Sequence, residues 1–263
     1  MRRPVIALLT DFGIQNHYVG AMRGTILTIC PDATLVDITH DVAPQDVPGA
    51  AFELGAAFRY FPPDTIFLAV VDPGVGSARK ALAAAAGGYR FVAPDNGLLT
   101  RVFREATPAL VVEITERRYA LPIISRTFEG RDRFAPAAAW LATGVTLTGL
   151  GGPVTEWQTL DLPTPTVTER GITGHVVRVD RFGNLVTSFP RDLVDALREG
   201  GGFQIAAAGH RIGALVGTYA EAEPGATCAL IGSSDDLEIA VIGGSAAARL
   251  GIGCGAVVTL TRG

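Results

Sequence analysis

The chain of 263 residues carries 22 Lys+Arg against 26 Asp+Glu, which gives a formal net charge of −4. Only 18% of the residues are charged and 48% are hydrophobic, so an intrinsically disordered chain is not expected. The length suits one large domain or two unequal ones, and the slightly acidic balance argues against a nucleic-acid partner. No apolar stretch approaches the roughly 18 residues that a membrane-spanning helix needs, so we expect no membrane partner.

The cysteine content points to a reducing compartment. Cys30, Cys228 and Cys254 are odd in number and form no CxxC pair, which favours neither a disulfide framework nor a zinc site. The N-terminal sequence MRRPVIALLTDFG holds only a short apolar run, so it predicts a first strand rather than a signal peptide. We therefore expect a cytoplasmic protein.

Residues 1–152 alternate short apolar runs with helix-like segments. Strands are predicted at Val5–Thr10, Thr34–Ile38, Thr65–Val71, Ala81–Ala85, Tyr89–Ala93 and Leu110–Ile114. Helices are predicted at Tyr18–Ile29, Val47–Tyr60, Leu98–Arg104 and Arg131–Thr143. This alternation predicts an N-terminal α/β layered domain with a largely parallel sheet.

The character of the sequence changes after Gly151. Residues 153–170 contain three prolines and show no periodicity, so they predict an extended linker. Beyond them, short strands are predicted at Ile172–Asp180, Leu185–Phe189, Phe203–Ala207, Arg211–Val216, Thr227–Ile231, Leu237–Ile242 and Ala256–Thr261. With one short helix near Leu193–Arg198, residues 171–263 predict a smaller C-terminal all-β barrel domain.

Acidic side chains directly follow two of the predicted strands. Asp11 comes after the first strand, and Asp72 comes after the strand at Thr65–Val71. Ligands of parallel α/β sheets bind outside the carboxyl ends of the strands, although an Asp at this place can also simply start a turn. Arg79 follows Asp72 by seven residues, across a glycine-containing loop that can fold back on itself. The two side chains can form an oriented carboxylate–guanidinium site, or a surface ion pair of little energetic value.

Three further polar segments are open to a functional and a structural interpretation. RTFEGRDRFAP (126–136) holds Glu129 just before a predicted helix, where charged residues can also mark a helix start. VDRFGNLVTS places Asp180 and Asn184 on a tight turn, which can recognise a heterocycle and an ammonium group or be an ordinary hairpin turn. The loop at 232–240 is open to the same two interpretations.

Asp37, His40 and Asp41 form the pattern that comes nearest to a metal site. Such a sequence-local cluster is more often a turn with a hydrogen-bonded histidine, so we expect no metal. The sequence also contains no Walker loop, GxSxG elbow or HExxH motif.

Taken together, seven motifs resemble one known family over nearly the whole chain. In chain order they are LLTDFG…YVGAMRG, VDITHDV…AA, FLAVVDPGVGSAR, FVAPDNGLLT, TFEGRDRFAPAAAWLATG, VDRFGNLVTS and LEIAVIGGSAA. They are similar to those of the S-adenosyl-L-methionine (SAM) hydroxide adenosyltransferases, which are adenosine-forming SAM hydrolases related to the fluorinating and chlorinating SAM enzymes. VVDPGVGSAR and APDNGLLT are the most specific of these motifs.

This resemblance implies a fold, an assembly and a reaction. The expected protein joins an α/β domain to a β-barrel and forms a homotrimer, with SAM bound between the N-terminal domain of one subunit and the C-terminal domain of its neighbour. Family members attack the 5′ carbon of the SAM ribose with water and release adenosine and methionine. The sulfonium is already a good leaving group, so no metal or other cofactor is implied. Retention of VDPGVGSAR favours hydrolysis over halogenation.

The resemblance also implies roles for single residues. Asp72 and Arg79 match two members of a water-orienting Asp-Arg-His set. The expected substrate contacts are the ribose hydroxyls for Asp11, adenine for Asn184, the methionine amino group for Asp180, and the methionine end for Ser233 and Ser234.

One departure from the family pattern concerns the third catalytic position. The family motif reads TFHGRD, and this chain has Glu129 where the histidine belongs. A carboxylate differs from an imidazole in charge and in hydrogen-bonding capacity, so Glu129 can either be a usable base or leave a protein that only binds SAM or adenosine. A second departure is Asn16-His17 after DFGIQ, where an Asp is common.

Overall fold

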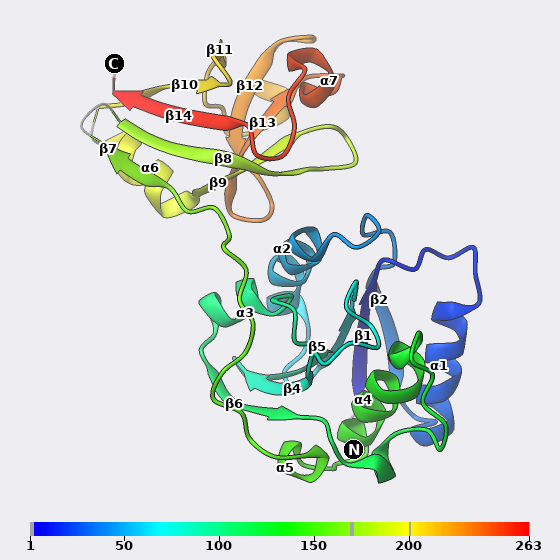
Figure 1. Cartoon of the computed structure of the whole chain (residues 1–263). Helices are drawn as coiled ribbons and strands as arrows, with labels where there is room; N and C mark the ends of the chain where they lie inside the picture. The colour runs from blue at the N-terminus through cyan, green and yellow to red at the C-terminus, as the bar shows by residue number, and fades with distance from the viewer. Residues whose placement is uncertain (1–2, 169–170, 200, 263) are drawn as a thin grey trace. The chain divides into compact units, whose positions relative to one another are not determined.

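The computed structural model describes residues 3–168, 171–199 and 201–262. The chain divides into two compact units, Met1–Asp161 and Leu162–Gly263, which Figure 1 shows in blue to green and in green to red. This division falls inside the predicted linker 153–170, of which residues 169–170 lie outside the described part. The domain boundaries expected at 152 and 171 stay predictions.

The N-terminal unit is built around a six-stranded mixed sheet in the order β2-β1-β3-β5-β4-β6. Its strands are β1 (Val5–Thr10), β2 (Thr34–Thr39), β3 (Ile66–Val70), β4 (Ala81–Ala86), β5 (Tyr89–Pro94) and β6 (Pro108–Glu113). Strand β1 pairs in parallel with β2 and β3, and β3 pairs in parallel with β5. Strand β4, however, is antiparallel to both β5 and β6, so the expected largely parallel sheet is not confirmed.

A two-residue turn explains this correction. Gly87 and Gly88 alone connect β4 to β5, and both have positive φ angles (59° and 84°). A connection of two residues can join only antiparallel strands, and two positive φ angles are the geometry of a tight hairpin turn that glycine adopts easily. The GG pair therefore reverses the chain inside an otherwise parallel arrangement.

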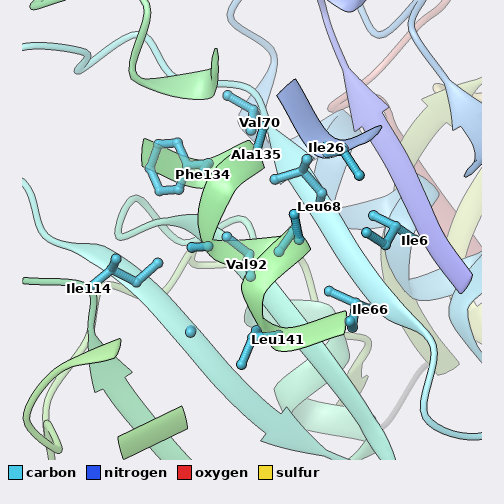
Figure 2. Close-up of a cluster of buried hydrophobic side chains, with 14 of the residues drawn as sticks. Ile6, Ile26, Ile66, Leu68, Val70, Val92, Ile114, Phe134, Ala135 and Leu141 are labelled. Atoms are coloured by element: carbon cyan, nitrogen blue, oxygen red, sulfur yellow. The ribbon is translucent and has the colours of Figure 1, made fainter. Parts of the chain in front are cut away.

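Helices cover both faces of this sheet. Their bounds are α1 (Tyr18–Ile29), α2 (Val47–Ala57), α3 (Thr100–Glu105), α4 (Ala135–Ala142) and α5 (Leu147–Leu150). Helices α1 and α4 pack on one face through a buried core that Figure 2 shows from Ile6 to Leu141, and α2 and α3 pack on the other. The chain enters α4 through a π-helical turn, η3 (Gly130–Phe134), a local irregularity that is often found at functional sites.

The C-terminal unit is an antiparallel sheet that curls into half of a barrel (Figure 1). Its elements are β7 (Thr166–Thr168), β8 (Gly171–Val179), β9 (Leu185–Pro190), α6 (Arg191–Glu199), β10 (Phe203–Ala207), β11 (His210–Arg211), β12 (Thr227–Ile231), β13 (Asp236–Val241), α7 (Ala246–Leu250) and β14 (Val257–Arg262). The strand order β11-β10-β14-β8-β9-β13-β12, with β7 beside β8, ends at β11 and β12. A closed, all-β barrel is therefore not confirmed among the described residues.

Most predicted elements are confirmed, and the exceptions have local causes. The strand predicted at Arg211–Val216 is wrong beyond Arg211, because residues 212–216 run beside β12 with isolated bonds instead of a ladder. Helix α7 was not predicted, although Ser245 caps its start and Gly251 ends it in the left-handed region. Within the described part of the chain, no helix is long and apolar enough to cross a membrane.

Candidate active site

Asp11 and Asp72 lie at the same end of two neighbouring strands of the N-terminal sheet. They follow the parallel neighbours β1 and β3, in which Thr10 lies opposite Val70. The carboxyl ends of these strands thus place both residues where α/β sheets hold ligands. Asp11 Oδ2 accepts a hydrogen bond from the backbone N–H of Gln45 (2.8 Å), which fixes the orientation of its carboxylate.

The loop after β3 turns back and brings Arg79 to Asp72. Inside the loop, Val75 N donates to Asp72 O (3.2 Å) and Ser77 N donates to Gly74 O (3.1 Å). Gly76 occupies the left-handed region with φ of 78°, which completes the reversal. The glycines of DPGVGSAR therefore allow the loop to reverse, so that Asp72 and Arg79 meet within one short segment of the sequence.

Arg79 binds two carboxylates. Its Nε donates to Asp72 Oδ1 (2.9 Å) and Oδ2 (3.0 Å), and its Nη2 donates to Asp72 Oδ2 and to Glu129 Oε2 (2.7 Å). The side chains of Arg79, Asp72 and Glu129 are only 9%, 5% and 11% exposed, so these contacts are shielded from water. Burial lowers the pKa of Arg79, but its bonds to Asp72 and Glu129 outweigh that effect and raise it overall.

The turn η3 supplies the third member of this cluster. Glu129 stands immediately before η3, and Phe134 at the end of η3 puts its ring 5.1 Å from the Arg79 guanidinium carbon. Figure 2 shows Phe134 among the buried apolar side chains beside α4, so the same turn anchors the core and the cluster. Arg133, four residues after Glu129, places Nη2 3.8 Å from Glu129 Oε1. No sequence signal assigned Arg133 a role.

Asp37 and His40 belong to a chain of polar contacts that starts at Thr10. Thr10 Oγ1 lies 2.8 Å from His40 Nδ1, while His40 Nε2 lies 3.0 Å from Asp37 Oδ1. Arg23 also binds Asp37; burial raises the pKa of Asp37, but the bonds from Arg23 and His40 outweigh it and lower the pKa overall. Among the described residues, no group of three metal-binding side chains occurs. The prediction of a turn with a hydrogen-bonded histidine is confirmed by the contact between His40 and Thr10.

An aromatic group lies beside these polar residues. The rings of Phe12, Tyr18 and Phe128 are 5.2–5.9 Å apart, centroid to centroid. Phe12 and Phe128 are the sequence neighbours of Asp11 and Glu129, so the group gives this part of the edge an apolar wall. The sequence alone did not identify it, because Phe12 and Phe128 are 116 positions apart and only the tertiary fold joins them.

In the C-terminal unit, Asp180 and Asn184 belong to one tight turn. Asp180 Oδ1 accepts from the backbone N–H groups of Phe182 and Asn184 (2.8 Å each), and Oδ2 accepts from Asn184 Nδ2 (3.0 Å). Gly183 has φ of 82°, as the turn requires. The hairpin-turn geometry is confirmed, and the binding roles of both side chains stay predictions.

The turn between β12 and β13 carries Ser233 and Ser234. Ser233 is exposed and Ser234 partly buried. Close by in sequence, the buried Glu238 accepts a hydrogen bond from the Tyr219 hydroxyl. Burial raises the pKa of Glu238, and burial together with the bond to Glu238 raises the pKa of Tyr219. This pair was not predicted from the sequence, where Tyr219 stands in an irregular segment.

The fold and the cluster define a two-unit protein with a buried carboxylate–guanidinium group beside the carboxyl ends of the parallel strands β1 and β3. Residues 6–151 match the SAM hydroxide adenosyltransferase N-terminal domain, and residues 174–259 match the SAM hydroxide adenosyltransferase C-terminal domain. The chain belongs to the SAM hydroxide adenosyltransferase family.

Similar proteins agree with this membership. The (R)-S-adenosyl-L-methionine hydrolase of Thermus thermophilus is 40% identical, over 98% of this chain and 99% of its own. A fluorinase from an Actinoplanes species is 30% identical over 76% of each chain. The crystal structure of an uncharacterized conserved protein from Thermotoga maritima superimposes with a TM-score of 0.92 at 36% identity and covers 98% of this chain and 100% of its own.

Proposed function

We propose that this protein hydrolyses SAM to adenosine and L-methionine. The observation that carries the proposal is the buried cluster of Asp72, Arg79 and Glu129. It lies beside the carboxyl ends of β1 and β3 in a chain that belongs to this family. Relatives that are 37–40% identical over almost the full chain are hydrolases by name, whereas fluorinases are more distant.

The reaction is an in-line displacement at the ribose 5′ carbon. The oxygen of a water molecule forms a bond to C5′ while the bond between C5′ and the sulfonium sulfur breaks, and methionine leaves with the electron pair. Because the substrate brings a positively charged leaving group, the protein needs to supply only an oriented water, a dry pocket and an acceptor for one proton. We therefore propose a reaction without metal or other cofactor.

The other predicted residues are proposed to hold the substrate. We propose that Asp11 accepts hydrogen bonds from the ribose hydroxyls; in support, the backbone N–H of Gln45 orients its carboxylate. In the C-terminal unit we propose adenine contacts for Asn184, a methionine amino contact for Asp180, and contacts to the methionine end for Ser233 and Ser234.

We further propose a homotrimer in which each SAM is held by the N-terminal unit of one subunit and the C-terminal unit of its neighbour. In support, the candidate catalytic and substrate-binding residues are divided between the two units. Light scattering is expected to give the mass of three chains. Mixing an inactive Asp72→Asn protein with an inactive Asp180→Asn protein, followed by subunit exchange, restores part of the activity only if sites are shared between subunits.

We also propose a cytoplasmic location, which the free cysteines Cys30, Cys228 and Cys254 support.

The hydrolysis is tested by incubating the protein with SAM and separating the products by chromatography. Adenosine and methionine in equal amounts, absent with Asp72→Asn, support the proposal. A 5′-haloadenosine formed on addition of chloride would show a halogenating enzyme instead. Glu129 in the place of the family histidine favours one other candidate, a protein that binds SAM without turnover. Calorimetry that shows SAM binding without products, and products once Glu129→His is made, would support that candidate.

A further inference from the structure

The hydrogen bonds of the cluster distinguish its four carboxylate oxygens. Both oxygens of Asp72 accept from Arg79, and so does Glu129 Oε2. Glu129 Oε1 alone has no hydrogen bond within the described residues, because its nearest cation, Arg133 Nη2, stays at 3.8 Å. Glu129 Oε1 is thus the oxygen of the cluster with the most acceptor capacity left.

We propose that Glu129 Oε1 accepts the proton of the attacking water, and that Arg133 is a positioning residue that holds Glu129 for this task. This inference rests on the hydrolysis proposed above and divides its roles among the residues. As the water oxygen bonds to C5′ and the C5′–S bond breaks, one water proton passes to Oε1 and later leaves to solvent. Asp72 and Arg79 then orient Glu129 instead of acting on the proton.

Arg79 and Arg133 contact different oxygens of the Glu129 carboxylate. Arg79 is almost fully buried and donates from Nη2 to Oε2, so it fixes the Oε2 side of the Glu129 carboxylate. Arg133 is 29% exposed and approaches Oε1 as an ion pair without hydrogen-bond contact. This arrangement orients the Glu129 carboxylate while leaving Oε1 without a hydrogen-bond donor among the described residues.

The test compares variants in kcat for SAM and in the dissociation constant of SAM measured by calorimetry. Loss of a general base costs about 100-fold or more in rate, so we expect that loss for Glu129→Gln, with the dissociation constant within about threefold of the wild type. Arg133→Gln is expected to lower kcat about fivefold, and Arg133→Lys to restore most of it, because an ammonium can still pair with Glu129. Arg118→Gln removes the same charge from an exposed arginine and serves as the matched control.

A double variant separates positioning from a merely structural role. If Arg133 acts through Glu129, Glu129→Gln/Arg133→Gln is no slower than Glu129→Gln alone, whereas independent roles make the two losses multiply. A wild type that forms adenosine together with a Glu129→Gln protein that keeps a third of its kcat would overturn the assignment of the proton acceptor. Multiplying losses would overturn the positioning role. A wild type that forms no adenosine removes the proposed hydrolysis itself, and with it this inference.

Discussion

A substitution of Gly76 should affect both the stability of the N-terminal unit and the geometry of the Asp72–Arg79–Glu129 cluster. Gly76 lies in the loop between Asp72 and Arg79 with φ of 78°, and a Cβ atom at this position would lie 2.5 Å from the backbone oxygen of Arg126. Gly76→Ala therefore meets two penalties, a left-handed backbone for a residue with a Cβ and a collision with backbone that cannot rotate away. The loop must move, and Asp72 and Arg79 move with it.

The size of the effect follows from these two penalties. A left-handed conformation costs an alanine about 1–2 kcal/mol, and relief of the collision adds a similar amount, so we expect a loss of about 2–4 kcal/mol. At about 2–4 °C per kcal/mol for a unit of this size, that corresponds to a melting temperature lower by about 4–16 °C. Displacement of a catalytic group by about 1 Å can cost about 100-fold in rate, so kcat should fall by at least tenfold.

Gly74→Ala is the matched control in the same loop. Gly74 has no positive φ, and a Cβ there would meet its nearest atoms, in Ser77, Arg79 and Asp72, at 3.5–3.7 Å, which is ordinary contact. Calorimetric melting and SAM turnover should therefore show a small change for Gly74→Ala and a large one for Gly76→Ala. Equal effects of both substitutions, or an unchanged melting temperature in Gly76→Ala, would refute the reasoning.

Three further outcomes follow from single contacts. His40→Ala removes the partner of Thr10 beside Asp11, so the KM for SAM should rise about fivefold while kcat changes less, and steady-state kinetics with an unchanged KM would contradict this. Burial raises the pKa of Glu238 above 4.5, so the folded state holds its proton more tightly than the unfolded chain, and this contribution to stability is lost as the pH rises through the folded pKa. Melting curves between about pH 4.5 and neutrality should therefore show Glu238→Gln improving relative to the wild type as the pH rises, and a constant difference would contradict it. Asp46→Ala removes the side chain that accepts from Gly49 N (2.9 Å) at the start of α2 and should cost about 1 kcal/mol in chemical denaturation, whereas Asp46→Asn should cost less.

Strand positions were predictable from the sequence, but strand directions were not. The apolar run at Thr65–Val71 gave β3 to within a residue at each end, because a strand buried on both faces has no polar alternation to blur its limits. Hydrophobic periodicity contains no information on direction, so β4 was assigned to a largely parallel sheet. The signal that could have corrected it was Gly87-Gly88, a two-residue hairpin connection.

The candidate site was predictable only where its residues are close in sequence. Asp72 and Arg79 are seven positions apart, and the glycines between them let the loop close locally. Glu129 is 50 positions from Arg79, so only the family motif placed it at the site. Tyr219 and Glu238 meet through an irregular segment that no periodicity describes. Contacts of this kind depend on tertiary packing, which overrides local propensity.

The charges around Arg79 show how Glu129 can stand where the family motif has a histidine. A neutral imidazole would leave Arg79 balanced by Asp72 alone, with a net charge of zero for the pair. Glu129 adds a negative charge to this buried place, and an unbalanced buried charge is costly. Arg133, one helical turn later, supplies the compensating positive charge at 3.8 Å, so the four residues are again neutral together. The negative charge of the Glu129 carboxylate is therefore balanced within the same turn, so a carboxylate at this position is compatible with a working site.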